Sequence, residues 1–415
     1  MTRLKILWLS HFVPYPPVGG AYQRCYHLLK RLGAQHEVHL IALRHKHDTH
    51  PGIDEATERG ELGRFCRTVD IIDMSGSMKG LRLAARALAG AATALPLSVS
   101  VYRSAEVRRH VARRCRETAA DVVHFDVLGL APFLDVIGDV PTVVSHMGAE
   151  SLMIERRITT DPKLLKKLFF SFEAVALRRY ERRTCGRFDL NIVVSDDDGR
   201  ILKRIAPDAS FATVANGVDL DYFQPVTPAG DRTLLFAGRL DQYSNRGGLL
   251  HFIEHAWPLV TARYPDVVFH IIGNNPPEPL LTMAAADPRI KVHGFVPDIR
   301  PFFAQSSVVV CPLRDGGGTR LKILDALALG LPIVSSTIGC EGIDVVAERH
   351  LLIADSPMEF ARQIGRLFDD PALARTLVSE GRRLIETTYS WDALTDQLID
   401  CYRSVAGHGL SRRTA

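Results

Sequence analysis

Residues 310–336 carry groups that can bind a phosphate ester. The segment runs from an apolar strand through three glycines into a helix and then into a second apolar strand. Gly316, Gly317 and Gly318 let backbone amides approach a ligand closely, and a helix starting at Thr319 points unpaired amides and its positive dipole end the same way. Such a site favours an anion such as a diphosphate. An ordinary α/β crossover with a glycine-rich turn would show the same pattern.

The helix that follows adds charged side chains to this site. Lys322 and Asp325 stand three residues apart on one face, so a cation and a carboxylate flank the anion. An ionised Asp325 can accept hydrogen bonds from both hydroxyls of a ribose. We also assign Arg320 and Leu321 to the site, because they lie in the first helical turn.

A second glycine pair occurs near the start of the chain. Gly19 and Gly20 precede a helical pattern, and Arg24 lies about one turn inside it. This suits a close approach to a phosphate or a sugar, although a loop that merely starts a helix needs no ligand. The pair does not fit G-x-G-x-x-G, which disfavours a dinucleotide-dependent oxidoreductase.

Three further polar side chains occur at or beyond the ends of predicted strands. His146 ends an apolar strand, where a neutral imidazole can donate to a sugar hydroxyl or act as an acid or base; a structural histidine is the alternative. Arg239 follows another strand and Arg246 precedes Gly247. Two guanidiniums there can neutralise a departing diphosphate without a metal, unless they are simply solvated surface side chains.

Two uncharged residues complete the predicted site. Gly273 ends a strand and permits close backbone approach, and Phe295 follows another strand, where a nucleotide base can stack. We find no nucleophile elbow, no H-E-x-x-H and no P-loop lysine. The sequence therefore predicts no obligatory metal or cofactor.

Composition indicates an ordinary two-domain protein of the cytoplasm. The chain has 415 residues, of which 46% are hydrophobic and 24% charged, and its length exceeds what one core usually supports. The 7 cysteines are scattered without a C-x-x-C pair, which indicates reduced thiols. The first apolar run is too short for a signal peptide, and the most apolar window, residues 87–102, is broken by Pro96.

The positive charge is concentrated in the first half. The formal net charge is +4, yet residues 79–117 hold nine Lys/Arg against two acids and residues 151–190 hold ten against five. Together with the Leu/Ala-rich residues 80–95, this favours contact with an anionic membrane at the inner face of the cytoplasmic membrane, unless the charges form a solvated helix face. Aromatic residues make up only 7%, and no nucleic-acid recognition motif accompanies the charges.

Alternation of strands and helices predicts an α/β fold with two doubly wound parallel sheets. We expect an N-terminal domain over residues 1–208, a C-terminal domain over 209–390, and a ligand cleft between them. Strands are predicted at residues 4–10, 37–43, 121–126, 141–147 and 190–195 in the first half, and at 212–216, 233–238, 267–273, 291–295, 307–313, 332–336 and 350–354 in the second.

Taken in order, these motifs resemble a retaining GT-B glycosyltransferase of the family 4 type, similar to bacterial enzymes of polysaccharide or lipopolysaccharide assembly. The matching motifs are the GG loop, SH, VVSDDD, ANGVD, FAGRL, IIGNNP, VHGFV and GGTRLKILDALALGLPIVSS. The resemblance implies two Rossmann-like domains and transfer of a sugar from a UDP- or GDP-sugar to a hydroxyl acceptor. It also implies an acceptor in the first domain, a nucleotide in the second, and a helix near residues 391–405 that returns to the first.

By the resemblance, Arg239 binds the diphosphate, Asp325 binds ribose in place of the usual Glu, His146 lies beside the donor sugar, and Gly19 and Gly20 lie beneath its phosphate. The chain departs from the family at two positions. Gly317 stands where the first of two paired acids is usual, with either Asp315 or backbone amides as its substitute, and Arg246 is the nearest substitute for a displaced lysine. Two alternatives remain: a sugar-nucleotide epimerase and a non-catalytic partner protein on the same fold.

Overall fold

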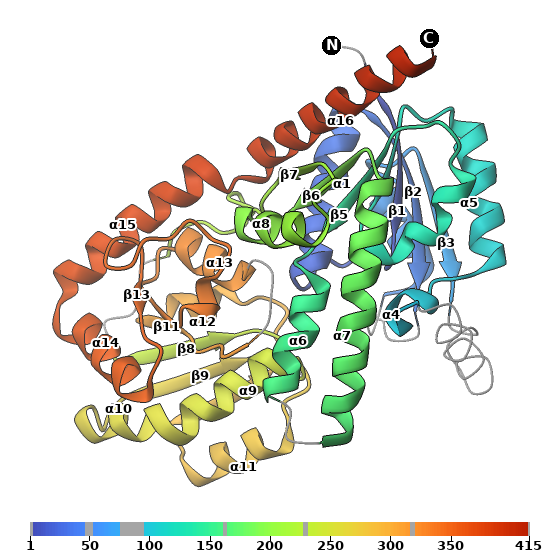
Figure 1. The fold of residues 1–415 in the computed structure, drawn as a ribbon. Coiled ribbons are helices and arrows are strands. Elements are labelled where there is room, and N and C mark those ends of the chain that lie inside the picture. The colour runs from blue at the N-terminus through green and yellow to red at the C-terminus, as the bar shows by residue number, and fades with distance from the viewer. Residues whose placement is uncertain are drawn as a thin grey trace. The chain divides into compact units, whose positions relative to one another are not determined.

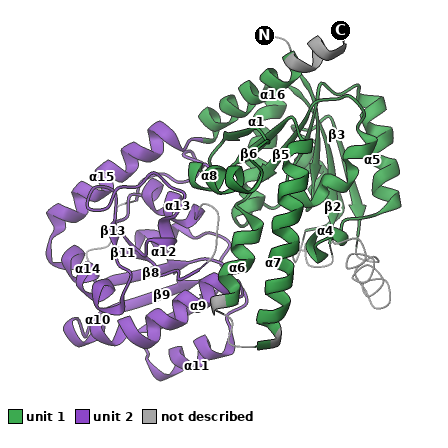
Figure 2. Ribbon diagram, viewed as in Figure 1, with its two compact units in different colours: residues 1–215, 391–415 green, residues 216–390 purple. Residues whose placement is uncertain are grey.

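The protein was analysed as a computed structural model, which describes residues 3–45, 53–74, 95–160, 164–226, 231–315 and 320–413. The chain divides into two compact units (Figures 1 and 2). The first comprises residues 1–215 and 391–415, and the second comprises residues 216–390. The boundary thus follows Ala215 rather than residue 208, and the C-terminal helix belongs to the first unit.

The described residues of the first unit form a seven-stranded sheet, and strands and helices alternate as predicted. Its strands are β1 (Lys5–Ser10), β2 (Glu37–Arg44), β3 (Thr68–Asp73), β4 (Val122–Phe125), β5 (Thr142–His146), β6 (Leu190–Val193) and β7 (Phe211–Thr213). Its helices are α1 (Gly20–Gln35), α2 (Glu55–Leu62), α4 (Leu97–Ser100), α5 (Ala105–Thr118), α6 (Glu150–Thr160), α7 (Leu164–Thr184), α8 (Asp196–Ile205) and α16 (Trp391–Arg413), with 3-10 helices η2 (Leu128–Val136) and η3 (Cys185–Arg187).

The second unit repeats the alternation on a smaller scale. Its strands are β8 (Thr233–Ala237), β9 (Val268–Ile272), β10 (Ile290–Gly294), β11 (Val308–Cys311), β12 (Ile333–Ser335) and β13 (Leu352–Ile353). Its helices are α9 (Tyr243–His251), the π-helix η4 (Phe252–Ala256), α10 (Trp257–Arg263), α11 (Glu278–Ala286), α12 (Arg300–Ala304), α13 (Leu321–Leu329), the 3-10 helix η5 (Ile338–Cys340), α14 (Pro357–Asp369) and α15 (Pro371–Thr388).

Both sheets are doubly wound, as the sequence predicted. The first has the strand order β3-β2-β1-β4-β5-β6-β7 and the second β10-β9-β8-β11-β12-β13, with every named pair parallel. Continuous apolar runs form the central strands because helices cover both faces of such sheets. The four side chains of β11, for example, are all buried.

Local signals set where several helices begin and end. The Ser195 hydroxyl accepts from the Asp198 amide at the start of α8, whose first turn holds three aspartates. Ser356 and Glu359 form a capping box at the start of α14. Helix α13 stops at Gly330, whose φ of 78° is left-handed.

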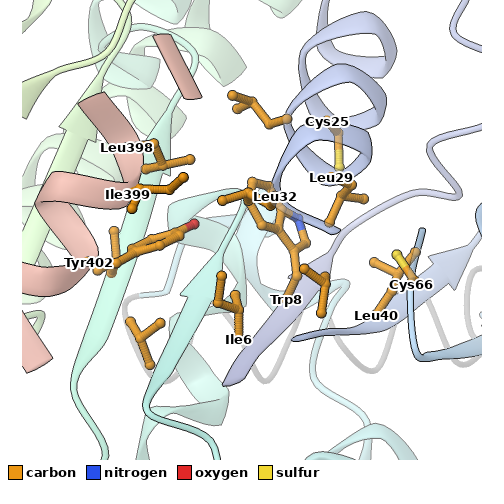
Figure 3. Packing of buried hydrophobic residues seen from close by; sticks show 14 of the residues in the cluster. Ile6, Trp8, Cys25, Leu29, Leu32, Leu40, Cys66, Leu398, Ile399 and Tyr402 are labelled. Atoms are coloured by element: carbon orange, nitrogen blue, oxygen red, sulfur yellow. The ribbon is translucent and has the colours of Figure 1, made fainter. Parts of the chain in front are cut away.

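The core of the first unit joins both ends of the chain. Trp8 from β1 and Tyr402 from α16 are 2% and 0% exposed and belong to one apolar cluster, and Figure 3 shows them among side chains of α1 and β2. His124 of β4 connects them, because its ring stacks on Trp8 at 3.8 Å between centroids and its Nδ1 lies 2.8 Å from the Tyr402 hydroxyl.

The structure differs from the sequence prediction at two strands. Strand β3 was missed, because most of its side chains are only partly buried and its apolar run is short. The strand predicted at residues 212–216 is β7, which forms the edge of the first sheet rather than starting the second.

Among the described residues, no helix is both long and apolar enough to span a bilayer. The Leu/Ala-rich residues 80–95, which we considered for membrane contact, lie almost entirely outside the described ranges.

Candidate active site

Each sheet has one point at which its strand order reverses. In the first unit it lies between β1 and β4, and in the second between β8 and β11. Doubly wound sheets bind ligands at the carboxyl ends of the two strands that flank such a point. The residues that follow these four strands are therefore the candidate site residues of each unit.

In the second unit, the residues after β8 present an exposed guanidinium. The Arg239 side chain is 55% exposed, and its Nε and Nη2 donate to the Asp241 carboxylate at 3.3 and 3.2 Å. Asp241 also accepts from Asn275 Nδ2 at 3.1 Å. Burial raises the pKa of Asp241, but these bonds from Arg239 and Asn275 outweigh it and keep the pKa below its usual value. Arg239 is thus held in place at the carboxyl edge of the sheet.

Lys322 of α13 reaches the same edge from inside the unit. Its Nζ donates to Asn245 Oδ1 at 2.7 Å and lies 4.2 Å from the centre of the Phe236 ring. Burial lowers the pKa of Lys322 to about 8, so the ammonium is still mostly charged at neutral pH. A Cβ at Gly238 would lie 2.6 Å from this nitrogen. Glycine at position 238 therefore leaves the space that Lys322 occupies.

Asp325 lies one helical turn further along α13. The residue is 7% exposed, and within the described part of the chain its buried Oδ1 has no hydrogen-bond partner. Burial raises the pKa of Asp325 to about 8, although the charge of Lys322 opposes the rise. A buried carboxylate oxygen without a donor is costly, because folding has removed its water without replacing it. It is the atom of this site that most needs a ligand.

Gly273 has a different role from the predicted one. A Cβ at this position would lie 1.8 Å from the carbonyl oxygen of Gly238, and the Gly273 amide donates to the Gly294 carbonyl at 2.9 Å. The close approach that glycine permits is therefore to the neighbouring strand ends. Gly273 holds the ends of β8, β9 and β10 together, which supports the site without showing a ligand contact.

Two other predicted residues are exposed side chains near this edge. Arg246 lies on α9, with its guanidinium 5.8 Å from the centre of the Tyr243 ring. Phe295 follows β10 and is 62% exposed, so a base can reach it. Binding by either residue stays a prediction.

The glycine-rich loop itself cannot be described. Gly316, Gly317, Gly318 and Thr319 lie outside the described residues, so their predicted contacts with phosphate remain predictions. The loop is flanked by Asp315, which is 7% exposed, and by Arg320, which precedes α13 as its N-cap residue. Leu321 is also 7% exposed and so is mainly a core residue.

In the first unit, the sequence analysis missed a histidine–aspartate pair. The Nδ1 of His11 lies 2.9 Å from Oδ1 of Asp126, and the His11 amide donates to the same carboxylate at 3.0 Å. The Ser10 hydroxyl donates to Asp126 Oδ2 at 2.7 Å. Ser10 ends β1 and Asp126 follows β4, so the pair stands at the point of strand reversal. The sequence signal for this pair is that both residues come directly after predicted strands, and they meet because those strands are neighbours in the sheet.

Glu150 at the start of α6 interacts electrostatically with His11. Burial, followed by the negative charges of Glu181 and Glu173, raises the pKa of Glu150 to about 7, while His11 lowers it. A carboxyl group that titrates near neutral pH can hold a proton and release it there. Glu150, like His11 and Asp126, is therefore a candidate site residue of the first unit.

His146 does not belong to the site, contrary to the sequence prediction. The residue is 3% exposed, and its Nε2 lies 3.0 Å from the Asn191 side-chain oxygen on the neighbouring strand. Burial lowers the pKa of His146 to about 4, against the effect of the bond to Asn191. A neutral imidazole fixed inside the sheet cross-links β5 to β6. The sequence could not show which way this side chain points.

Arg24 is likewise an interior residue rather than a phosphate ligand. It is 1% exposed, and its Nη1 donates to the Ala215 carbonyl at 2.7 Å. Burial lowers the pKa of Arg24 to about 10. Gly19 is the N-cap of α1 with a φ of 100°, which favours glycine, and Gly20 is the first helical residue. The start of α1, with Gly19 and Gly20 but without Arg24, remains a candidate contact for a phosphate or a sugar.

No group of three or more His, Cys, Asp or Glu side chains positioned to hold a metal occurs among the described residues. The sequence analysis predicted that the reaction needs no metal ion. That remains a prediction.

Two doubly wound parallel sheets, each with its own strand reversal, are the architecture of the GT-B fold. Residues 18–222 match the model of "Glycosyltransferase Family 4", and residues 231–370 match "Glycosyl transferases group 1". The chain belongs to the family 4 type of GT-B glycosyltransferases. The family resemblance found in the sequence is thus confirmed.

Curated relatives include phosphatidyl-myo-inositol mannosyltransferases of two mycobacteria. The protein of Mycolicibacterium smegmatis is 28% identical over 257 residues, which cover 59% of this chain and 64% of the relative. That of Mycobacterium tuberculosis is 27% identical over 219 residues, which cover 49% and 56%. The matched part of this chain therefore spans less than two thirds of either relative's length.

Several solved structures superpose on nearly the whole chain. Sucrose-phosphate synthase from Thermosynechococcus elongatus superposes with a TM-score of 0.72 at 18% identity, covering 98% of this chain and all of that one. Anabaena Alr3699/HepE in complex with UDP-glucose gives a TM-score of 0.64 at 16% identity, covering 97% of this chain and 100% of that one. At these identities the similarity shows the fold alone.

Proposed function

We propose that the protein transfers a sugar from a nucleotide-diphospho-sugar to a hydroxyl acceptor, with retention of the anomeric configuration. Family membership supports the reaction class, and the UDP-glucose complex of Anabaena Alr3699/HepE supports the kind of donor. The acceptor class that we favour is a glycan or a lipid-linked glycan, used in the cytoplasm or at the inner face of its membrane. A UDP- or GDP-sugar is the donor, and no further cofactor is required.

The observation that carries this proposal is the unpartnered Oδ1 of Asp325. It lies on the helix that follows the glycine-rich loop, one turn beyond the partly buried ammonium of Lys322. A nucleoside diphosphate offers a ribose diol for the carboxylate and anionic oxygens for the ammonium, so one ligand meets both needs. The cost of the buried carboxylate is then offset only in the bound state.

The cationic residues of the second unit act mainly on the leaving diphosphate. The bond from the anomeric carbon to the diphosphate oxygen breaks, and its electron pair goes to that oxygen. The acceptor oxygen attacks from the same face, and its proton passes to the leaving phosphate. Arg239 and Lys322 stabilise the developing negative charge, with Arg246 as a third candidate. No protein nucleophile is needed.

In the first unit, His11 is the candidate that contacts a sugar hydroxyl. Its Nδ1 is fixed by Asp126, which orients the ring at the reversal between β1 and β4. Its side chain is 23% exposed, unlike that of the interior His146. We therefore assign the contact with a sugar hydroxyl to His11 rather than to His146.

A panel of UDP-, GDP- and dTDP-sugars tests the proposal. The intact chain should release a nucleoside diphosphate slowly by hydrolysis and should be stabilised against heat by the matching donor. NMR of the product with a supplied acceptor then reads the anomeric configuration. Conversion of the donor to a new sugar isomer without acceptor would identify an epimerase, and no binding or release with any donor would identify a non-catalytic protein.

A further inference from the structure

Helix α7 of the first unit turns a stripe of large apolar side chains toward solvent. Leu164, Leu168, Phe172 and Val175 are 72%, 62%, 64% and 50% exposed. Their spacings of four, four and three residues put them on one side of the helix over about three turns. Single exposed apolar residues are common, but a continuous stripe on one helix is a recognised sign of an interaction surface.

The opposite side of α7 already packs on the first unit. Ala174 and Leu177 are each 2% exposed, and α7 lies against α6. The carboxylate of Glu173 accepts from the amides of Leu97 and Ser98, both at 3.1 Å, and that of Glu181 accepts from the Ser151 hydroxyl at 2.6 Å. The inner side therefore accounts for the folding of α7, and the outer stripe is not required for it.

Charge distinguishes the two ends of the outer side. The last two turns carry Arg178, Arg179, Arg182 and Arg183, all exposed and on the same side as the apolar stripe. Arg178 pairs with Glu155 at 3.2 Å, and no ion pair of Arg179, Arg182 or Arg183 with a carboxylate occurs among the described residues. Both acids of α7 point inward. We define the docking face as these four arginines together with Leu164, Leu168, Phe172 and Val175.

We propose that the docking face binds the surface of an anionic phospholipid membrane. The apolar turns enter the boundary between headgroups and acyl chains, and the arginines contact lipid phosphates. Long arginine side chains can extend to the headgroups while the helix body lies deeper. The helix lies on the membrane and does not span it. Figure 2 shows α7 as an element of the first unit.

Other partners fit the docking face less well. A second copy would bring arginines against arginines in a parallel pairing and arginines against the apolar stripe in an antiparallel one, with no carboxylate in either. A nucleic acid would match the arginines but leave Leu164, Leu168 and Phe172 in water. A surface with an apolar interior and an anionic boundary complements both ends.

Vesicle flotation of the full-length protein tests the proposal, without any sugar donor. Vesicles of equimolar phosphatidylcholine and phosphatidylglycerol should bind the wild type, more tightly than phosphatidylcholine alone and less tightly as salt is raised. The double variant Leu168→Ser/Phe172→Ser should weaken binding about tenfold or more. The triple variant Arg179→Gln/Arg182→Gln/Arg183→Gln should bind both vesicle types alike.

Met358→Ser is the matched control, because Met358 is 75% exposed on α14 of the second unit. It should bind as the wild type does. Equal thermal stability of all variants shows that they are folded, which is expected since only exposed side chains change.

No binding to either vesicle, or binding unchanged in both multiple variants, overturns the proposal. A concentration-dependent dimer that the Ser variant abolishes, without vesicle binding, identifies a second copy as the partner. Because no donor is present, these outcomes are independent of the proposed transfer reaction.

Discussion

The imidazole of His11 and the carboxylate of Asp126 are joined by a 2.9 Å contact across the ends of β1 and β4. These two strands are neighbours in space but are separated by more than a hundred residues of sequence. The same carboxylate also accepts from Ser10 and from the His11 amide. One buried acid thus fixes the conformation of the chain after β1.

Replacing Asp126 with Ala should destabilise the first unit by about 2–3 kcal/mol, because it leaves three donors without their acceptor. The matched change Ser10→Ala removes only one of these bonds and should cost about 1 kcal/mol. Urea unfolding followed by tryptophan fluorescence would measure both, in a Trp257→Phe background that leaves Trp8 and Trp391 of the first unit as the reporters. Equal effects of the two variants would show that Asp126 does not organise this turn.

Asp325→Asn should separate stability from binding. In the free protein it removes a buried charge that lacks a donor, so unfolding at pH 8 should require about 1 kcal/mol more free energy than in the wild type. Nucleotide binding should nevertheless weaken by about tenfold or more, since an amide accepts less well from a diol. Calorimetry and thermal unfolding measure the two effects, with Asp221→Asn as an exposed control. Tighter nucleotide binding by Asp325→Asn would contradict the assignment.

The raised pKa of Asp325 also predicts how stability depends on pH. Its folded pKa of about 8 lies above the ordinary value of 3.8, so the folded state holds the proton more tightly. This contribution is fully present below pH 3.8 and is lost as the pH rises through 8. The Asn variant should lack it. Donor binding at pH 7 should release a proton, which titrations in buffers of different ionisation enthalpy can count.

Arg239→Ala should lower kcat/KM by about 10- to 200-fold, the loss expected when one charge-assisted contact to the leaving group is removed. Arg232→Ala is the matched control, because Arg232 also pairs with an aspartate, Asp266, but precedes β8 instead of following it. The control should keep its turnover. Full activity of the Arg239 variant with a verified donor would exclude this arginine from the site.

Two glycine variants test the packing of strand ends. Gly273→Ala forces a methyl group to 1.8 Å from the Gly238 carbonyl, so it should cost about 3 kcal/mol and lower nucleotide affinity by displacing the Arg239 turn. Gly247→Ala lies within α9 with no atom within 4 Å of the added carbon and should stabilise by about 0.5–1 kcal/mol. Melting temperatures of the two proteins should therefore move in opposite directions.

The sequence predicted the fold better than it predicted which side chains reach the site. Apolar strand runs and their alternation with helices were sufficient for two doubly wound sheets. Whether His146 faced a ligand or Asn191 depends on the side-chain orientation at a strand end, which periodicity does not reveal. Arg24 was misjudged for the same reason, because a buried arginine and a phosphate ligand can occupy the same helical position.

His11 and Asp126 were missed for a different reason. Each is unremarkable alone, and only the strand order brings them together. Lys322 and Asp325 were singled out because their spacing within one helix is a local signal, and both do lie on α13. A pairing within one helix can be read from the sequence, whereas a pairing between distant strands requires the topology.

Because α16 contributes Tyr402, Leu398 and Ile399 to the core that β1 begins, the first unit is built from both ends of the polypeptide. During synthesis on the ribosome, β1 therefore emerges long before α16, which completes its core. Residues 216–390 form a contiguous stretch and can fold before α16 has been made. A nascent chain stalled before Trp391 would expose an unfinished apolar surface to chaperones and proteases.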